Sequence, residues 1–412
     1  MVERPVQHPV QPDVPPDPLT LEGPGPRARD ESRAGLYVHV PFCAVHCHYC
    51  HFSTAAFSHA AVERWFAALE REVALRAPLA RDVAFTSVFF GGGTPSALSS
   101  RQFRRLWELL AAHFTWTPGA EITLEANPES AKAPLLETWR ACGVNRLSFG
   151  AQSFERAELK QLGRIHDEAR PLEAVALARA HGFERVSLDL MYGYPGHRPE
   201  AFARTLERVA SLGLEHVSAY CYIPEGVAPE GERALAAGGE ALSDDAQAAL
   251  YAQLDDAMTR MGLGGYETSN WCRPDAESRH NLTYWLRRDW LALGPSAHSL
   301  WRGERWANRF ATADWAAALE RGEDGAGERE RPPEAAICDE IVMLASRLST
   351  GLRWEDYPDA TRAALEHRYG RAFAAAHAAG RLESVPGGWR IPRAHRFLAD
   401  DTIAWMAARA RG

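Results

Sequence analysis

Three cysteines fall within eight positions of one another, at Cys43, Cys47 and Cys50. The spacing C-x3-C-x2-C places three thiolates on one short loop, where they can reach three irons of a single 4Fe–4S cubane. The fourth iron then has no protein ligand and is open to a small molecule that can chelate it. Because a fourth cysteine would instead suit electron transfer, the spacing indicates an iron–sulfur cluster with one open iron.

A zinc site is the alternative interpretation of these cysteines. His46, His48 or His51 could complete a tetrahedron of three cysteines and one histidine. Structural zinc sites normally draw their ligands from two knuckles, and no second cysteine pair exists in the sequence, so the cluster is favoured. The other cysteines are interpreted as small buried residues: Cys142, Cys221, Cys272 and Cys338.

Length and composition bound the class of protein. The chain has 412 residues, which predicts two or three domains, and its formal net charge of −8 offers no general attraction to nucleic acid. No window holds about 18 uninterrupted apolar residues, so we expect no transmembrane segment. No apolar segment follows Met1, and crowded cysteines in a chain without an export signal favour metal or redox chemistry over disulfides. We therefore expect a cytoplasmic protein.

Short β-rich segments alternate with amphipathic segments from Gly35 to about residue 223. Such alternation predicts an α/β fold with a parallel sheet and right-handed crossovers. The expected strands are 36–40, 83–90, 121–126, 146–150, 185–191 and 216–223. The expected helices between them are 59–76, 99–113, 130–141, 168–181 and 199–212.

Glycines and polar residues stand at the carboxyl ends of these strands, where β/α barrels build their active sites. The run Gly91-Gly92-Gly93-Thr94-Pro95 follows the second strand and allows a ligand to approach the backbone closely. We interpret that ligand as the amino and carboxylate end of S-adenosylmethionine (SAM), which can chelate the open iron. Four further residues supply acceptors for ribose hydroxyls and the methionyl amine and a donor for the carboxylate: Glu125, Gln152, Arg164 and Asp189.

These segments together resemble the radical SAM family of oxygen-independent coproporphyrinogen III oxidases. The matching pieces include YVHVPFC, FGGGTPS, LEANPE, RLSFGAQSF, LGRIH and DLMYGYPG, and the resemblance runs from about Gly35 to the C-terminus. It implies an incomplete (β/α)6 barrel in which one electron from the cluster cleaves SAM to a 5′-deoxyadenosyl radical. The residues implied to contact SAM are Tyr37, Gly92, Gly93, Thr94, Glu125, Gln152, Arg164 and Asp189.

Two features separate the subfamilies. The oxidases carry a further cysteine two residues after the third cluster ligand, where this chain has Phe52. The heme chaperone subfamily, HemW, carries an HNxxYW motif, which is complete here as His280, Asn281, Tyr284 and Trp285. The chain is therefore similar to HemW. It departs from the family pattern at His51, Val227 and Ser296.

HNxxYW suits heme because an imidazole can ligate iron and aromatic rings can flank a porphyrin. The alternative is a buried helix start, with Asn281 as the cap and Tyr284 and Trp285 in the core. The motif lies about 60 residues beyond the last predicted barrel strand, so we expect a heme site that is separable from the cluster site.

The resemblance and the composition divide the chain into five segments. These are a disordered Pro-rich segment (1–34), the partial barrel (35–230), a family-specific region with HNxxYW (231–320), a linker (321–333) and a C-terminal domain (334–412). Helices near 334–348, 359–368, 371–379 and 396–410, with a hairpin at 382–391, predict a mainly helical, winged-helix-like end.

The resemblance implies a heme chaperone that carries a 4Fe–4S cluster and SAM, binds heme and transfers it to an acceptor protein. Two other functions stay open at this point. One is the oxidative decarboxylation of coproporphyrinogen III, and the other is a radical SAM methyltransferase. Whether SAM is cleaved and whether the chain forms a homodimer are likewise open.

Overall fold

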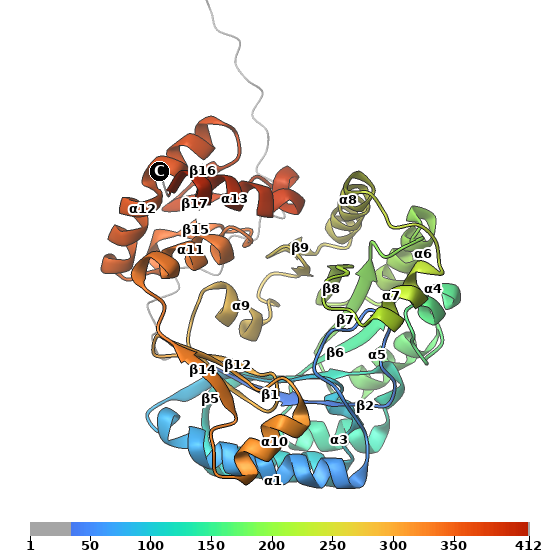
Figure 1. Cartoon of the computed structure of the whole chain (residues 1–412). Helices are drawn as coiled ribbons and strands as arrows, with labels where there is room; N and C mark the ends of the chain where they lie inside the picture. The colour runs from blue at the N-terminus through green and yellow to red at the C-terminus, as the bar shows by residue number, and fades with distance from the viewer. Residues whose placement is uncertain (1–33, 411–412) are drawn as a thin grey trace, which may run out of the picture.

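The computed structural model describes residues 34–410, so the disorder expected for 1–34 falls outside the described residues except at Ala34. A curved parallel sheet with helices on its outer side forms the centre (Figure 1). Its strands pair in chain order, which confirms the incomplete (β/α)6 barrel. They are β1 (Gly35–Val40), β4 (Ala84–Gly92), β5 (Thr115–Ala126), β6 (Arg146–Gln152), β7 (Arg185–Tyr192) and β8 (His216–Cys221).

The crossover helices begin where their sequences supply caps. Ser58 accepts a hydrogen bond from the Ala61 amide at the start of α1, and Ser99 forms a capping box with Gln102 at the start of α2. These helices cover the outer face of the sheet. They are α1 (His59–Arg76), α2 (Ser100–His113), α3 (Ala133–Ala141), α4 (Arg156–Gln161), α5 (Arg170–Ala180) and α6 (Pro199–Ala210).

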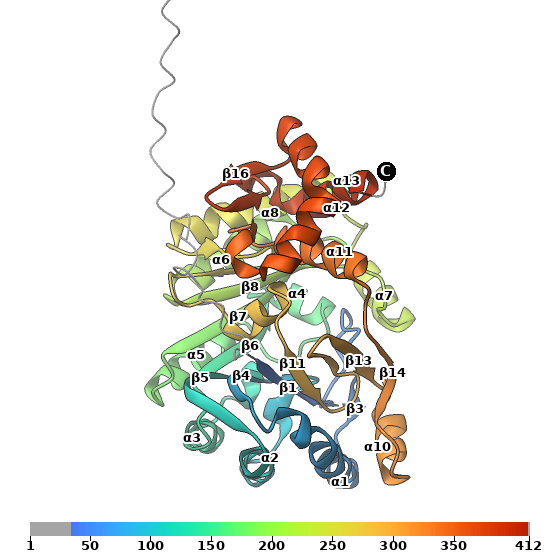
Figure 2. The same cartoon turned by 90° about the vertical axis from the view of Figure 1, so that its left-hand side faces the viewer.

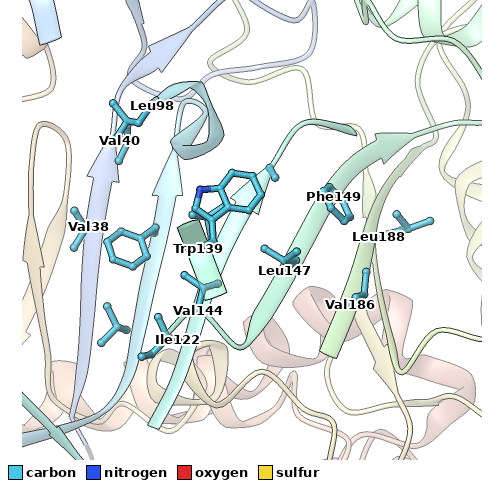
Figure 3. Packing of buried hydrophobic residues seen from close by; sticks show 14 of the residues in the cluster. Val38, Val40, Leu98, Ile122, Trp139, Val144, Leu147, Phe149, Val186 and Leu188 are labelled. Atoms are coloured by element: carbon cyan, nitrogen blue, oxygen red, sulfur yellow. The ribbon is translucent and has the colours of Figure 1, made fainter. Parts of the chain in front are cut away.

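The two faces of the parallel strands differ in polarity. Apolar side chains such as Val38, Leu147 and Phe149 are fully buried and pack toward Trp139 of α3 (Figure 3). Burial of each such side chain contributes about 1.5–3 kcal/mol. The alternate positions point into the barrel and are polar yet buried: Ser87, Glu121, Arg146, Ser148, Ser187, His216 and Ser218. The interior is therefore a polar chamber.

The sheet continues past the barrel on both sides, which corrects two expected boundaries. Strand β11 (Trp290–Leu293) pairs with β1 in parallel, so the region 231–320 contributes to the central sheet. The expected linker 321–333 is wrong in part, because it contains strand β14 (Ala326–Glu330). Pairing satisfies backbone groups that would otherwise be exposed on edge strands. The other added strands are β12 (His298–Trp301), β13 (Glu304–Asn308), β10 (Asn270–Cys272) and β9 (Gly264–Gly265).

Shorter elements complete the barrel. Strands β2 (Phe42–Cys43) and β3 (Ala55–Ala56) pair with each other at the two ends of the cysteine loop. The remaining helices of this part are α7 (Pro229–Ala236), α8 (Asp244–Arg260), α9 (Arg279–Trp285) and α10 (Thr312–Glu320).

The C-terminal elements form the helices and hairpin expected of a winged-helix-like arrangement, and they lie on the side of α8 and α9 (Figures 1 and 2). The separate helices expected at 359–368 and 371–379 are one helix, α12 (Asp359–Ala378). Gly370 interrupts the helical pattern, but packing of Tyr369 and Phe373 outweighs its cost of about 1 kcal/mol. The other elements are α11 (Glu334–Ala345), α13 (Ala399–Ala410), β15 (Leu352–Arg353), β16 (Glu383–Val385) and β17 (Gly388–Arg390).

Within residues 34–410, every helix is too short or too polar to cross a lipid bilayer.

Candidate functional site

The cysteine loop connects β1 to α1 at the carboxyl end of the barrel. Cys43, Cys47 and Cys50 are half-buried, and the Cys50 amide donates to the Cys47 carbonyl at 3.1 Å. Cys43 Sγ lies 3.3 Å from Thr94 Oγ1 in the glycine-rich loop after β4. Burial raises the pKa of the Cys50 thiol to about 11. A thiol with a raised pKa is a poor free nucleophile, because the thiolate is the reactive form.

Arg164 links the cysteine loop to two strand ends. Its Nη1 donates to Cys47 Sγ at 3.2 Å, and its Nη2 donates to Asn127 Oδ1 at 2.7 Å and to the Gly150 carbonyl at 2.9 Å. Its Nε is buried, and the described residues provide it with no hydrogen-bond partner. The guanidinium is therefore fixed beside Cys47, where it can form a charge-assisted hydrogen bond to the sulfur.

Two carboxylates project into the barrel below the cysteine loop. Glu125 Oε2 accepts from the Gly92 amide at 3.3 Å, and Asp189 Oδ1 accepts from Ser148 Oγ at 2.8 Å. Burial, together with the nearby charge of Asp189, raises the pKa of Glu125 to about 8. Burial likewise raises the pKa of Asp189. Both acids are therefore suited to a ligand that brings an amine and hydroxyl groups.

Tyr37 is oriented by a residue that our sequence analysis missed. His39 Nε2 lies 2.9 Å from the Ser53 carbonyl, which can only accept, so His39 Nδ1 is the acceptor and Tyr37 Oη donates to it at 3.1 Å. Tyr37 and His39 occupy alternate positions of β1, both facing the chamber. The period-two pattern of the strand, YVHV, is the signal that could have found His39.

Gln152, the remaining predicted SAM contact, ends β6. It is buried and has φ 67°, a backbone conformation that is uncommon outside glycine. A Cβ on Gly150 would lie 2.9 Å from Gln152 Nε2, which places the amide beside the residue whose carbonyl binds Arg164. The structure thus brings all eight predicted SAM contacts to the chamber or its rim.

The glycine run is needed for packing as well as for ligand approach. A Cβ on Gly93 would lie 2.6 Å from the carbonyl carbon and oxygen of Pro41 and 3.1 Å from Cys43 Sγ. Gly92 has φ 108°, and a Cβ there would lie 2.6 Å from the His39 ring. Besides the ligand approach that the sequence predicts, these glycines therefore make room for the cysteine loop and the His39 ring.

The HNxxYW motif forms helix α9, whose N-cap is Ser278 and not Asn281. His280 is 1% exposed, with Nδ1 2.9 Å from Ser87 Oγ and Nε2 2.7 Å from Tyr284 Oη. Burial lowers the pKa of His280 to about 3. Both nitrogens have protein partners, so neither is free to ligate a heme iron in this conformation. Trp285 and Asn281 are half-buried.

The motif is not separate from the barrel. The His280 ring stacks on Phe89 of β4, with centroids 5.0 Å apart, and it lies 6.3 Å from the Tyr37 ring. The backbone amide of His280 donates to Glu121 Oε1 on β5 at 3.2 Å. The sequence separation suggested two independent sites, but β11 returns the chain to β1 and α9 enters the chamber on the way.

Comparisons with known proteins agree with this geometry. Residues 37–209 match the model of the radical SAM superfamily. The heme chaperone HemW of Mycobacterium tuberculosis is 36% identical over 321 residues, which are 77% of this chain and 82% of that protein. This chain belongs to the HemW family of radical SAM proteins.

Similar proteins occur in animals as well as in bacteria. The mitochondrial radical S-adenosyl methionine domain-containing protein 1 of Bos taurus is 33% identical over 81% of this chain and 78% of its own length. Among solved structures, the coproporphyrinogen III oxidase HemN of Escherichia coli has a TM-score of 0.79 at 24% identity, over 93% of this chain and 92% of that one. This last likeness shows the shared fold.

The residues present fit the cluster and SAM that the family implies. Three half-buried thiols share one loop, and Arg164 is held against one of them. Within residues 34–410, no three His, Cys, Asp or Glu side chains are arranged to hold a single metal ion. The irons of a cubane are bound by separate thiolates, which need not converge on one point.

A cavity of about 280 Å³ elsewhere, lined by Arg146, Arg185 and Arg279, contains none of the predicted site residues.

The departures from the family pattern have distinct structural settings. Ser296 has φ 59°, so it adopts the left-handed conformation in which the glycine usual for the family would be unstrained. Val227 is buried in a small cluster against Tyr49. His51 is exposed near Gly226, and Phe52, which replaces the fourth cysteine of the oxidases, is 58% exposed.

Proposed function

We propose that this protein holds a 4Fe–4S cluster with SAM on its open iron, and that it binds heme and passes it to an acceptor protein. The heme part is carried by the likeness to the HemW heme chaperone over 82% of that relative's length. Phe52 in place of a fourth cysteine also supports a chaperone over a decarboxylase. Cluster and SAM are supported by the cysteine loop and its polar surroundings.

Each residue of the site has a role in this proposal. Cys43, Cys47 and Cys50 would hold the cluster, which could supply an electron to the SAM sulfonium. Glu125 accepts hydrogen bonds from the methionyl amine, and Asp189 accepts them from the ribose. In the apo conformation Arg164 already fixes Cys47, and the buried cation favours the SAM carboxylate nearby.

The affinity for SAM is expected to rise with pH up to about 8. Glu125 must be ionised to accept from the amine, and burial raises its pKa to about 8, so lowering the pH protonates it and weakens binding. The loss approaches tenfold per pH unit below the pKa. Calorimetric titration of the cluster-loaded protein between about pH 6 and pH 9 measures it. Glu125→Gln should weaken SAM binding at the high end of this pH range and make the affinity less dependent on pH. If the affinity varied with pH as in the wild type, the role of Glu125 would be contradicted.

Heme binding is expected without axial ligation by His280. Because both its nitrogens are hydrogen-bonded inside the barrel, His280→Asn should leave the Soret maximum of the heme complex in place. Trp285→Ala should weaken heme binding about tenfold, because it removes a half-buried aromatic surface of the motif. Heme titration followed by absorbance measures both effects.

The same preparation tests the decarboxylase alternative. With SAM and a reductant, coproporphyrinogen III should remain unconverted. Conversion at a rate that depends on Cys43 would contradict the chaperone proposal and support the decarboxylase. A Soret shift in His280→Asn would instead show that the motif opens to ligate heme.

A further inference from the structure

A hydrogen-bonded column joins α9 to the wall of the barrel. It runs from Ser87 Oγ to His280 Nδ1 at 2.9 Å and from His280 Nε2 to Tyr284 Oη at 2.7 Å. Ser87 is fully buried and His280 is 1% exposed. In a neutral imidazole one nitrogen donates and the other accepts, so the column is a directional chain of two hydrogen bonds. The chain fixes the position of the Tyr284 hydroxyl relative to β4.

The column lies against Tyr37 and near Glu125, which are two residues of the proposed SAM site. The His280 ring stacks with Tyr37 at a tilt of 28°. Tyr37 and Glu125 meet over Gly91, where a Cβ would lie 3.1 Å from both Tyr37 Cε2 and Glu125 Oε2. Burial raises the pKa of the Tyr284 hydroxyl, and the charge of Glu125 raises it further, so these two groups are close enough to interact.

We propose that the Ser87–His280–Tyr284 column positions Tyr37 and Glu125 and thereby sets the affinity for SAM. The inference rests on the SAM site proposed above, and it assigns His280 and Tyr284 a role other than contact with heme. Neither residue needs to touch SAM. By holding the His280 ring in place against Tyr37, the column limits the conformations open to Tyr37 and Glu125 before SAM binds.

A second column in the same barrel provides a matched control. Ser187 Oγ lies 2.8 Å from His216 Nδ1, and His216 Nε2 lies 3.1 Å from Tyr266 Oη. His216 and Tyr266 are each 4% exposed. Burial and the charge of Glu267 raise the pKa of the Tyr266 hydroxyl. Tyr266→Phe therefore breaks a second buried column, on the side of β7 and β8, and leaves the bonds among Ser87, His280 and Tyr284 in place; it also removes the hydroxyl that accepts from the Ser278 amide at the N-cap of α9 at 3.4 Å.

The test uses the full chain, reconstituted anaerobically with its cluster and titrated calorimetrically with SAM. Tyr284→Phe and Ser87→Ala should each raise the SAM dissociation constant about fivefold, the factor expected for one lost hydrogen bond. The double variant should be no weaker than the weaker single variant, because both changes break the same column. The electron paramagnetic resonance spectrum of the reduced cluster without SAM should stay unchanged. Tyr266→Phe should bind SAM within about twofold of the wild type.

Three outcomes would decide against the inference. Wild-type affinity in both Tyr284→Phe and Ser87→Ala would overturn it, and either variant alone suffices if the other does not fold. Equal weakening by Tyr266→Phe would show a general loosening of the barrel and would also overturn it. A wild-type chain that binds no SAM would refute the proposed SAM site itself. That result can be told apart from failure of the inference alone, in which the wild type binds SAM and the variants bind it equally well.

Discussion

Replacing Cys43, Cys47 or Cys50 with alanine is expected to abolish the cluster, lowering bound iron from about four per chain to nearly none. Each thiolate binds a different iron, and all three lie on one loop whose ends are joined by β2 and β3. One iron of the cubane already lacks a protein ligand. Loss of a thiolate from another iron exposes that iron to solvent as well, and the cluster is lost. Iron and sulfide analysis after anaerobic reconstitution measures the result, with the absorbance of the cluster as a second readout.

Cys338→Ala is the matched control for these variants. Cys338 is 1% exposed in the apolar core of the C-terminal elements, so its removal should cost stability without changing iron content. A wild-type chain that binds one zinc ion and no iron would contradict the cluster and favour the zinc alternative. Full iron content in any of the three alanine variants would show that the residue is not a ligand.

Gly93→Ala is expected to lose both the cluster and the response to SAM. The added Cβ would lie 2.6 Å from the Pro41 carbonyl carbon and oxygen, where backbone must shift, and 3.1 Å from Cys43 Sγ. Overpacking of this kind costs about 1–3 kcal/mol, and here the strain falls on the loop that carries the ligands. Iron content should fall to less than about half, and SAM should no longer perturb the paramagnetic spectrum of any remaining cluster.

Gly370→Ala serves as the control for Gly93→Ala. Nothing lies within 4 Å of a Cβ at Gly370, and alanine in the middle of a helix should stabilise the chain by roughly 0.5–1 kcal/mol. Its iron content should match the wild type. If Gly93→Ala retained the full cluster and its SAM response, the loop would have to be more adaptable than its contacts suggest.

The parts of the site that could be predicted are those encoded by neighbouring residues. Cysteine spacing, the glycine run and polar residues at strand ends are local patterns, and the prediction of Cys43, Glu125 and Asp189 as site residues rests on them. Asn127 and His39 were harder to recognise, because their roles depend on partners elsewhere. Asn127 is hydrogen-bonded to Arg164, which lies 37 positions away in the sequence, and His39 is hydrogen-bonded to the carbonyl of Ser53, which lies 14 positions away.

The strongest disagreement concerns HNxxYW. Its residues suit heme in isolation, and the distance along the chain suggested an independent site. The structure instead inserts His280 between Ser87 and Tyr284, where the imidazole is neutral and enclosed. The signal that would have revealed this is the buried polar side chain of Ser87 on β4, which needs a hydrogen-bond partner, together with Glu121 on β5, which has an oxygen left to accept after Arg146 of β6 has donated to the other.

The sequence by itself determined the cluster loop, the six parallel strands and the family, because each depends on spacing or periodicity within a short segment. Only the tertiary structure decided what closes the barrel: β11 beside β1, β14 within the expected linker, and α9 inside the chamber. These contacts join residues far apart in the chain, and they form because edge strands and buried polar groups must find hydrogen-bond partners wherever the fold provides them.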